Sequence, residues 1–179
     1  MTTLYVLIGL PASGKSSWAR ENVGRLRAVA VGSDDVRRDF QANGRDTLNT
    51  DLVFAEVERR AHSLLQAGQS VILDATHYNR QYRLYALQLA IEIDVRRVAV
   101  WFDLPLSICL ERNARRGEHN FDDEDGPFFL PTEELMRSIA DQFQPPGLDE
   151  FDEVVRVGRR SSRGSPAASA APTPVVPAW

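Results

Sequence analysis

The sequence predicts a three-layer α/β domain built on a parallel sheet of about five strands. Short aliphatic runs alternate with amphipathic segments along the chain, which is the order of elements in an α/β fold. The aliphatic runs are apolar throughout, as expected of strands that helices cover on both faces. The first run ends in a glycine-rich loop that leads directly into a helical segment.

Each predicted strand is a run of mostly β-branched and aliphatic residues. The five runs are residues 4–9, 27–31, 70–74, 95–102 and 154–157. Each predicted helix carries apolar residues three or four positions apart. The six helical segments are residues 15–23, the stretch that begins at Ser33, and residues 51–67, 79–93, 105–116 and 132–143.

Local signals mark the ends of several of these helices. Ser33 stands before an acidic pair, as an N-cap residue does, and Gly68 is a C-terminal stop. Pro105 suits a first helical turn, and Pro145 ends the last helix. One face of the helix at 79–93 carries an apolar row that consists of Leu84, Leu87 and Ile91.

We expect residues 1–157 to form one domain, with a lid at about residues 111–131. The stretch 158–179 is rich in Pro, Ser and Ala, and we expect it to be disordered because it has too little apolar surface to offset its ordering entropy. No acid opposes its three arginines, so the net charge of -4 for the whole chain becomes -7 for residues 1–157.

The composition predicts a cytoplasmic protein without a membrane segment. No apolar run approaches the roughly 18–20 residues that cross a bilayer, and no secretory signal is recognisable. The single cysteine, Cys109, has no partner for a disulfide or for a CxxC zinc site.

The loop after the first strand carries the pattern G-x-x-x-x-G-K-[ST] between a predicted strand and a predicted helix. Its lysine, Lys15, is the single lysine of the chain, which uses arginine for every other basic position. In this context the backbone N–H groups cradle phosphates, Lys15 bridges the β and γ phosphates of ATP, and Ser16 ligates Mg²⁺. The expected nucleotide-binding residues of the loop are Gly9, Pro11, Ala12, Ser13, Gly14, Lys15, Ser16 and Ser17. The structural alternative is a tight glycine turn.

The presence of a single lysine excludes one class of nucleotide-binding protein. A guanine-specific N-K-x-D motif needs a second lysine, so a Ras-like GTPase is excluded, and no LSGGQ signature is present. A small ATP-dependent phosphotransferase remains.

The second predicted strand leads into Ser33-Asp34-Asp35-Val36-Arg37. The carboxyl ends of adjacent parallel strands line the ligand crevice, so Asp34 can reach the γ-phosphate and accept a proton from an attacking hydroxyl. Arg37 lies one helical turn further and can hold an acceptor anion. The alternative is a helix N-cap whose acids complement the helix dipole.

The third predicted strand ends in Asp74, followed closely by His77. An Asp after a hydrophobic run is the position that supports magnesium in P-loop enzymes, with a capping Asp as the alternative. His77 fits a structural or substrate-lining role better than a catalytic one.

The segment from Glu111 to Gly117 places Arg112, Arg115 and Arg116 within about one helical turn. Phosphoryl transfer depends on cations that close on the phosphates, so Arg112 and Arg116 are candidate catalytic residues. A solvated basic face is the alternative.

Five segments together resemble the kinase domain of the 5′-polynucleotide kinases of phage and bacterial end-healing systems. In order over about residues 4–143, they are GLPASGKSSWARE, SDDVRR, ILDATHYNRQYR, ERNARRG and LPTEELMRSI. The resemblance implies that Asp34 is the general base for the 5′-hydroxyl and that Arg37 contacts the acceptor's phosphate. It also implies that Lys15 and Ser16 hold ATP and Mg²⁺, that Arg112 and Arg116 engage the donor phosphates, and that Asp74 supports the site.

Two features depart from that family. No phosphatase or ligase domain is present in this sequence, and the net negative charge contrasts with the basic channel that takes the acceptor strand. Three functions therefore stay open: phosphorylation of the 5′-hydroxyl of a nucleic-acid end in repair, phosphorylation of a small hydroxyl acceptor (nucleoside, sugar, antibiotic or the aminoacyl group of a tRNA), and a nucleotide-bound interaction module.

Overall fold

A single parallel sheet organises the computed structural model, which describes residues 1–117 and 130–158. Its strands run in the order β2-β3-β1-β4-β5, and every neighbouring pair is parallel. The strands are β1 (Thr3–Gly9), β2 (Ala28–Gly32), β3 (Ser70–Asp74), β4 (Arg96–Phe102) and β5 (Glu153–Val157). The helices are α1 (Lys15–Leu26), α2 (Ser33–Ala42), α3 (Thr50–Gln66), α4 (Arg80–Ile93), α5 (Leu106–Gly117) and α6 (Glu133–Asp141).

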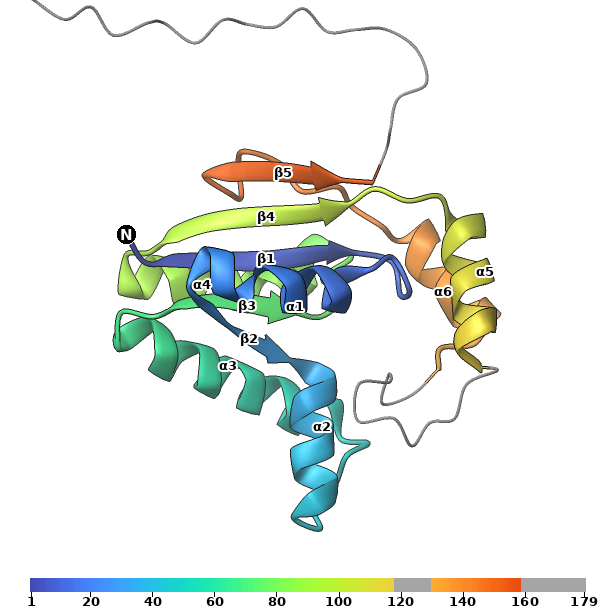
Figure 1. The fold of residues 1–179 in the computed structure, drawn as a ribbon, viewed down its shortest axis with the longest axis horizontal. Coiled ribbons are helices and arrows are strands. Elements are labelled where there is room, and N and C mark those ends of the chain that lie inside the picture. The colour runs from blue at the N-terminus through green and yellow to red at the C-terminus, as the bar shows by residue number, and fades with distance from the viewer. Residues whose placement is uncertain (118–129, 159–179) are drawn as a thin grey trace, which may run out of the picture.

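Helices cover both faces of the sheet, as the largely apolar strands predict. Successive strand side chains point to opposite faces. In β1, Leu4, Val6 and Ile8 pack with the apolar side chains of α2, α3 and α4, whereas Leu7 packs on the other face with Ala19 of α1. The arrows of Figure 1 all point toward the end of the sheet where α5 and α6 lie. The loops that follow β1, β2 and β3 therefore meet at this carboxyl edge.

The predicted fold class and the order of its elements are confirmed, and most boundaries agree to within three residues. One predicted cap is wrong, because Ser33 is the first residue of α2 and Gly32 is the N-cap, without a side-chain capping bond. The reason is that β2 runs directly into α2, which leaves no linker residue for a serine cap. The predicted tail at 159–179 and the central part of the predicted lid, 118–129, lie outside the described residues.

The apolar row predicted for α4 does not form its core-facing side. Leu84 and Ile91 are 50% and 65% exposed, whereas Ala86 and Ala90 are buried together with Arg83. The helix packs on the sheet through Leu89, two alanines and one arginine, whereas Leu84 and Ile91 on the opposite side face solvent. No described helix is both long and apolar enough to cross a membrane.

Gly9 allows the end of β1 to lie close to β4. A Cβ at this position would come within 2.8 Å of the Cβ of Phe102 and 3.1 Å of its carbonyl oxygen. The Gly9 N–H donates to the carbonyl of Thr76 over 3.2 Å, which ties the start of the phosphate-binding loop to the segment after β3. A larger residue would separate these strands.

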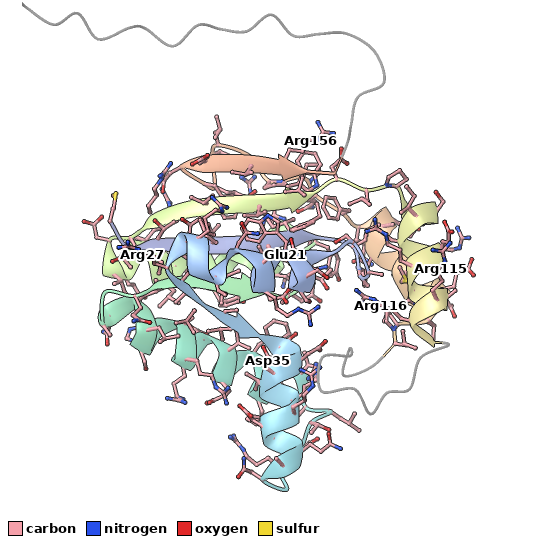
Figure 2. All side chains as sticks on the ribbon, viewed as in Figure 1. Glu21, Arg27, Asp35, Arg115, Arg116 and Arg156 are labelled. Atoms are coloured by element: carbon pink, nitrogen blue, oxygen red, sulfur yellow. The ribbon has the colours of Figure 1, made fainter. Side chains whose placement is uncertain are left out.

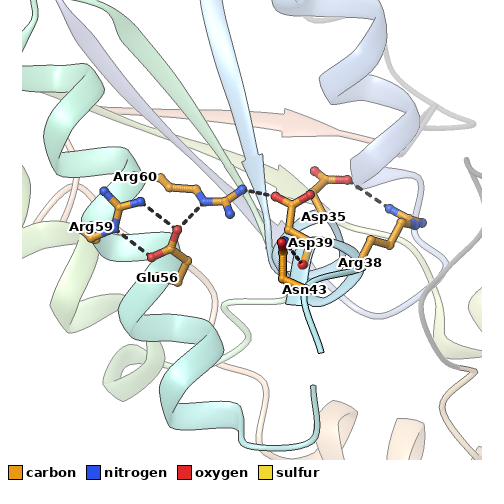
Figure 3. A network of polar contacts seen from close by, with 7 residues as sticks. All are labelled: Asp35, Arg38, Asp39, Asn43, Glu56, Arg59 and Arg60. Atoms are coloured by element: carbon orange, nitrogen blue, oxygen red, sulfur yellow. Dashed lines mark hydrogen bonds and ion pairs between the residues drawn. The ribbon is translucent and has the colours of Figure 1, made fainter. Parts of the chain in front are cut away.

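An ionic network joins α2 to α3, and Figure 3 shows it from close by. Arg60 donates to Glu56 over 2.8 Å and to Asp39 of α2 over 2.6 Å, and Arg59 donates twice to Glu56. Figure 1 shows α2 projecting away from the sheet, so this network fixes the helix that carries Asp34.

The network predicts a stability difference that depends on pH. Hydrogen bonds from Arg59 and Arg60 lower the pKa of Glu56 from 4.5 to about 2. A carboxyl group whose pKa is lower in the folded than in the unfolded state stabilises the fold when the pH is above its unfolded-state pKa. This contribution to the free energy of unfolding disappears as the pH falls from about 4.5 to about 2. We expect Glu56→Gln to lower the unfolding free energy by about 1 kcal/mol at pH 7, after solvent screening. In urea titrations the difference from the wild type should vanish near pH 2, and a constant difference would contradict this origin.

Candidate active site

The phosphate-binding loop joins β1 to α1 through two residues with left-handed backbone. Ala12 has φ 59° and Gly14 has φ 100°, and Gly14 is the N-cap of α1. Helix α1 starts at Lys15 and directs its first N–H groups toward the loop. Ala12 and Ser13 are buried and Pro11 is half-buried, while Ser16 and Ser17 are exposed. The predicted loop residues thus form one continuous turn around the helix start.

Lys15 lies inside this loop with its ammonium hydrogen-bonded. Its Nζ donates to the carbonyls of Gly9 and Leu10 over 3.0 and 2.8 Å. Burial lowers the pKa of Lys15 to about 8, against the opposing effect of the Asp74 carboxylate. The group therefore carries its charge at pH 7, and its third N–H can donate to a phosphate oxygen.

Asp74 and Ser16 meet at the end of β3. Burial raises the pKa of Asp74, and the opposing effects are a hydrogen bond from the Ser16 side chain and the charge of Lys15. Among the described residues no group of three or more His, Cys, Asp or Glu side chains could hold a metal ion. A half-buried carboxylate beside a serine hydroxyl supplies the hard oxygen ligands that Mg²⁺ prefers when phosphates complete its shell. The predicted pair therefore fits Mg²⁺.

Asp34 and Arg37 occupy the first turns of α2. The charge of Asp34 acts on both Lys15 and Asp74, so the predicted base lies in the electrostatic neighbourhood of the phosphate-binding loop. Arg37 donates to the carbonyl of Thr47 over 3.1 Å, in the loop before α3. The two predicted acceptor-side residues are thus on one helix, and Arg37 is already anchored to the neighbouring loop.

The arginines of α5 line a cavity with the phosphate-binding loop. The cavity measures about 360 Å³ and is lined by Ala12, Gly14, Ser17, Arg112, Arg115 and Arg116. Arg112 reaches toward the carbonyl of Ser13, 3.5 Å away, and the charge of Arg116 acts on Lys15. Figure 2 labels Arg115 and Arg116 on α5. The structure therefore brings the predicted pair Arg112 and Arg116 to the loop and adds Arg115, which also pairs with Glu111 over 2.5 Å.

His77 has a structural role. Its ring nitrogens contact the carbonyl of Leu7 over 2.9 Å and the Tyr85 hydroxyl over 2.8 Å. Because a carbonyl only accepts, Nδ1 carries the proton and Nε2 accepts from Tyr85. Burial lowers the pKa of His77 to about 4, so the ring is neutral at pH 7. With both nitrogens occupied, His77 fastens the segment after Asp74 to β1.

Two further side chains near the site are those of Cys109 and Ser13. Cys109 is a free, buried thiol, and burial raises its pKa, so it is not a nucleophile. The Ser13 hydroxyl is buried without a hydrogen-bond partner among the described residues.

Arg115 is a residue of the cavity that the sequence did not single out as a site residue. Its spacing of three residues from Arg112 on the same helix was the signal that could have identified it.

Known proteins match this chain over most of its described length. A family model described as an AAA domain matches residues 4–146. The L-seryl-tRNA(Sec) kinase of Methanococcus maripaludis is 26% identical over 156 residues, which cover 80% of this chain and 53% of that protein. The chain thus spans about half the length of this curated relative.

Solved structures share the fold. A chain of the Pnkp1/Rnl/Hen1 RNA repair complex superposes with a TM-score of 0.65 at 26% identity, over 79% of this chain and 43% of that chain. The APS kinase CysC of Mycobacterium tuberculosis, in complex with AMPPNP and APS, superposes with a TM-score of 0.55 at 21% identity, over 88% and 90%. These matches support the resemblance to 5′-polynucleotide kinases and confirm the P-loop kinase fold. The chain belongs to the AAA domain family, in the form of a P-loop kinase domain.

Proposed function

We propose that the protein transfers the γ-phosphoryl group of ATP to the 5′-hydroxyl of a polynucleotide, with Asp34 as the general base. The observation that carries the proposal is the common neighbourhood of Asp34, Lys15 and Asp74 at the carboxyl edge of the sheet. A base beside a phosphate-binding loop is what in-line attack by a hydroxyl requires. The 26% identity to a chain of an RNA repair complex supports a nucleic-acid acceptor.

In the proposed reaction the loop binds the ATP phosphates and Lys15 donates to them. Asp34 accepts the proton of the 5′-hydroxyl as its oxygen bonds to the γ-phosphorus, and the bond between that phosphorus and the β,γ-bridging oxygen breaks to release ADP. Arg112 and Arg116 donate to the phosphoryl oxygens as negative charge builds up on them. Ser16 and Asp74 would hold Mg²⁺, which would supply positive charge against the phosphates of ATP.

Arg37 serves the acceptor in this proposal. One of its N–H groups donates to the Thr47 carbonyl, which leaves other guanidinium donors for a phosphate of the polynucleotide. The anchor at Thr47 fixes the direction of the side chain, so Arg37 can hold the acceptor strand in register with Asp34 on the same helix.

The test is transfer of label from γ-labelled ATP, with Mg²⁺, to an oligonucleotide that bears a 5′-hydroxyl. The control is the same oligonucleotide with a 5′-phosphate, which has no free acceptor at that end. We expect label on the first oligonucleotide alone. Label on neither, while ATP binds, would contradict a polynucleotide acceptor.

A second candidate is phosphorylation of a smaller hydroxyl group, including the seryl group of an aminoacyl-tRNA. The 26% identity to the archaeal L-seryl-tRNA(Sec) kinase over 80% of this chain favours it, as does the net negative charge of the chain. Seryl-tRNA and free nucleosides, assayed beside the oligonucleotide, separate the candidates by which acceptor receives label.

A further inference from the structure

Two tyrosines form an aromatic pair directly after the end of β3. The ring centroids of Tyr78 and Tyr82 lie 4.9 Å apart with an interplanar angle of 39°. Tyr78 comes four residues after Asp74, and Tyr82 is in the first turn of α4, where its N–H donates to the Asn79 cap over 3.1 Å. In the proposed reaction neither ring has a role.

Tyr82 lies at the exposed end of the side of α4 that packs on the sheet. It precedes Ala86 and Leu89 by four and seven residues, so all three lie on the same side of the helix. Ala86 and Leu89 are 0% and 3% exposed because they pack on the sheet, whereas Tyr82 is 49% exposed. Tyr82 is therefore a half-exposed ring in the first turn of α4, close along the chain to the end of β3 at Asp74.

The carboxyl edge of the sheet is where the proposed reactants meet. Strand β3 lies between β2, which leads into Asp34, and β1, which leads into the phosphate-binding loop. Helices α3 and α4 also lie side by side at this level, since the rings of Phe54 and Tyr85 pack edge-to-face with centroids 6.2 Å apart. The start of α4 thus lies beside the start of α3, and the loop that precedes α3 is the one to which Arg37 is anchored.

The pair is held in place by its surroundings. The Tyr78 carbonyl accepts from the N–H of Gln144 over 2.8 Å, and a hydrogen bond joins the Tyr78 and Tyr82 side chains. Burial and this bond raise the pKa of Tyr78 to about 12, so the Tyr78 hydroxyl keeps its proton at pH 7. The nearby cation Arg80 is engaged by Asp149 and Glu150. A half-exposed aromatic ring held in place in this way is suited to stacking.

We propose that Tyr82, supported by Tyr78, stacks on the nucleobase of the acceptor's 5′-terminal nucleotide. This inference rests on the proposed function. It concerns the 5′-terminal nucleobase, a part of the acceptor that the proposed catalytic residues do not contact. Stacking on a ring face tolerates every base, so this contact favours a nucleotide acceptor without selecting its sequence. It also supplies an exposed aromatic surface for a nucleic acid on a chain whose net charge is negative.

The experiment is a double-mutant cycle on kcat/KM for the acceptor. Wild type and Tyr82→Leu are each assayed with a 5′-hydroxyl oligonucleotide and with the same oligonucleotide whose first nucleotide is abasic. Tyr82→Phe keeps the ring. Leu84→Ala is the matched control, because Leu84 is equally exposed on the same helix but points away from the sheet.

We expect loss of the base to lower the wild-type value about 5- to 150-fold, the range of one stacked base, and to change the Tyr82→Leu value less than twofold. Tyr82→Phe and Leu84→Ala should behave like the wild type, and the KM for ATP should be unchanged throughout. Equal penalties for the abasic end in the wild type and Tyr82→Leu would overturn the stacking role alone. Failure of the wild type to label any nucleic acid would overturn the proposed function and this inference with it. A free nucleoside, assayed in parallel, shows whether the base must belong to a chain.

Discussion

Asp34→Asn is expected to lower kcat for transfer to the 5′-hydroxyl by about 10²- to 10⁴-fold, the usual contribution of a general base. Asparagine keeps the size of the side chain and its place in the first turn of α2 but cannot take a proton at neutral pH. Binding of ATP depends on the loop around Lys15, so the Kd for ATP should stay within about threefold of the wild-type value. Rapid-quench turnover and equilibrium ATP binding measure the two quantities separately.

Asp35→Asn is the matched control for this prediction. Asp35 is the next residue along the chain, is exposed and pairs with Arg38 over 3.0 Å on the surface of α2 (Figure 3). Removing its charge should change kcat less than about threefold, since an exposed ion pair contributes little. Equal losses in the two variants would indicate a general effect of acidic charge on α2 and would remove Asp34 from the role of base.

The sequence predicted those parts of the site that consist of residues close together along the chain. The loop from Gly9 to Ser16 is a continuous motif, and its flanking strand and helix are recognisable from apolar spacing alone. Asp74 was predictable for a related reason, because it ends a fully apolar strand next to β1. The order of parallel strands then brings the ends of β1, β2 and β3 together without any further information.

The parts that the sequence did not predict depend on partners far along the chain. The side of α4 that packs on the sheet carries Arg83, and hydrophobicity assigned that side to Leu84 and Ile91 instead. Periodicity detects apolar rows, but a buried arginine is compatible with a core only if a distant carboxylate meets it. The exposure of Tyr82 likewise depends on where α4 begins relative to the strand ends. The spacing of residues along one helix does not determine that position.

Arg83→Met is expected to lower the free energy of unfolding by about 3–5 kcal/mol, because it leaves the buried carboxylate of Glu150 without its bidentate partner and with only Arg80, 3.6 Å away. The guanidinium and the carboxylate form a bidentate pair at 2.9 and 2.8 Å, and their side chains are 1% and 5% exposed. Arg83 also donates to the carbonyls of His77 and Gln144 over 3.1 and 3.0 Å. One side chain thus joins α4, the segment after Asp74 and the segment after α6.

A second variant separates the charge from the packing. Arg83→Met combined with Glu150→Met removes both charges, so its loss of stability should be smaller than the sum of the two single losses. Arg96→Met is the control, since Arg96 makes an exposed pair with Glu153 over 2.6 Å and should cost less than about 1 kcal/mol. Urea titration of the 179-residue chain gives all four values. Additive losses in the double variant would show that Arg83 and Glu150 stabilise the fold independently, through packing and backbone contacts, and that their mutual charge contributes nothing.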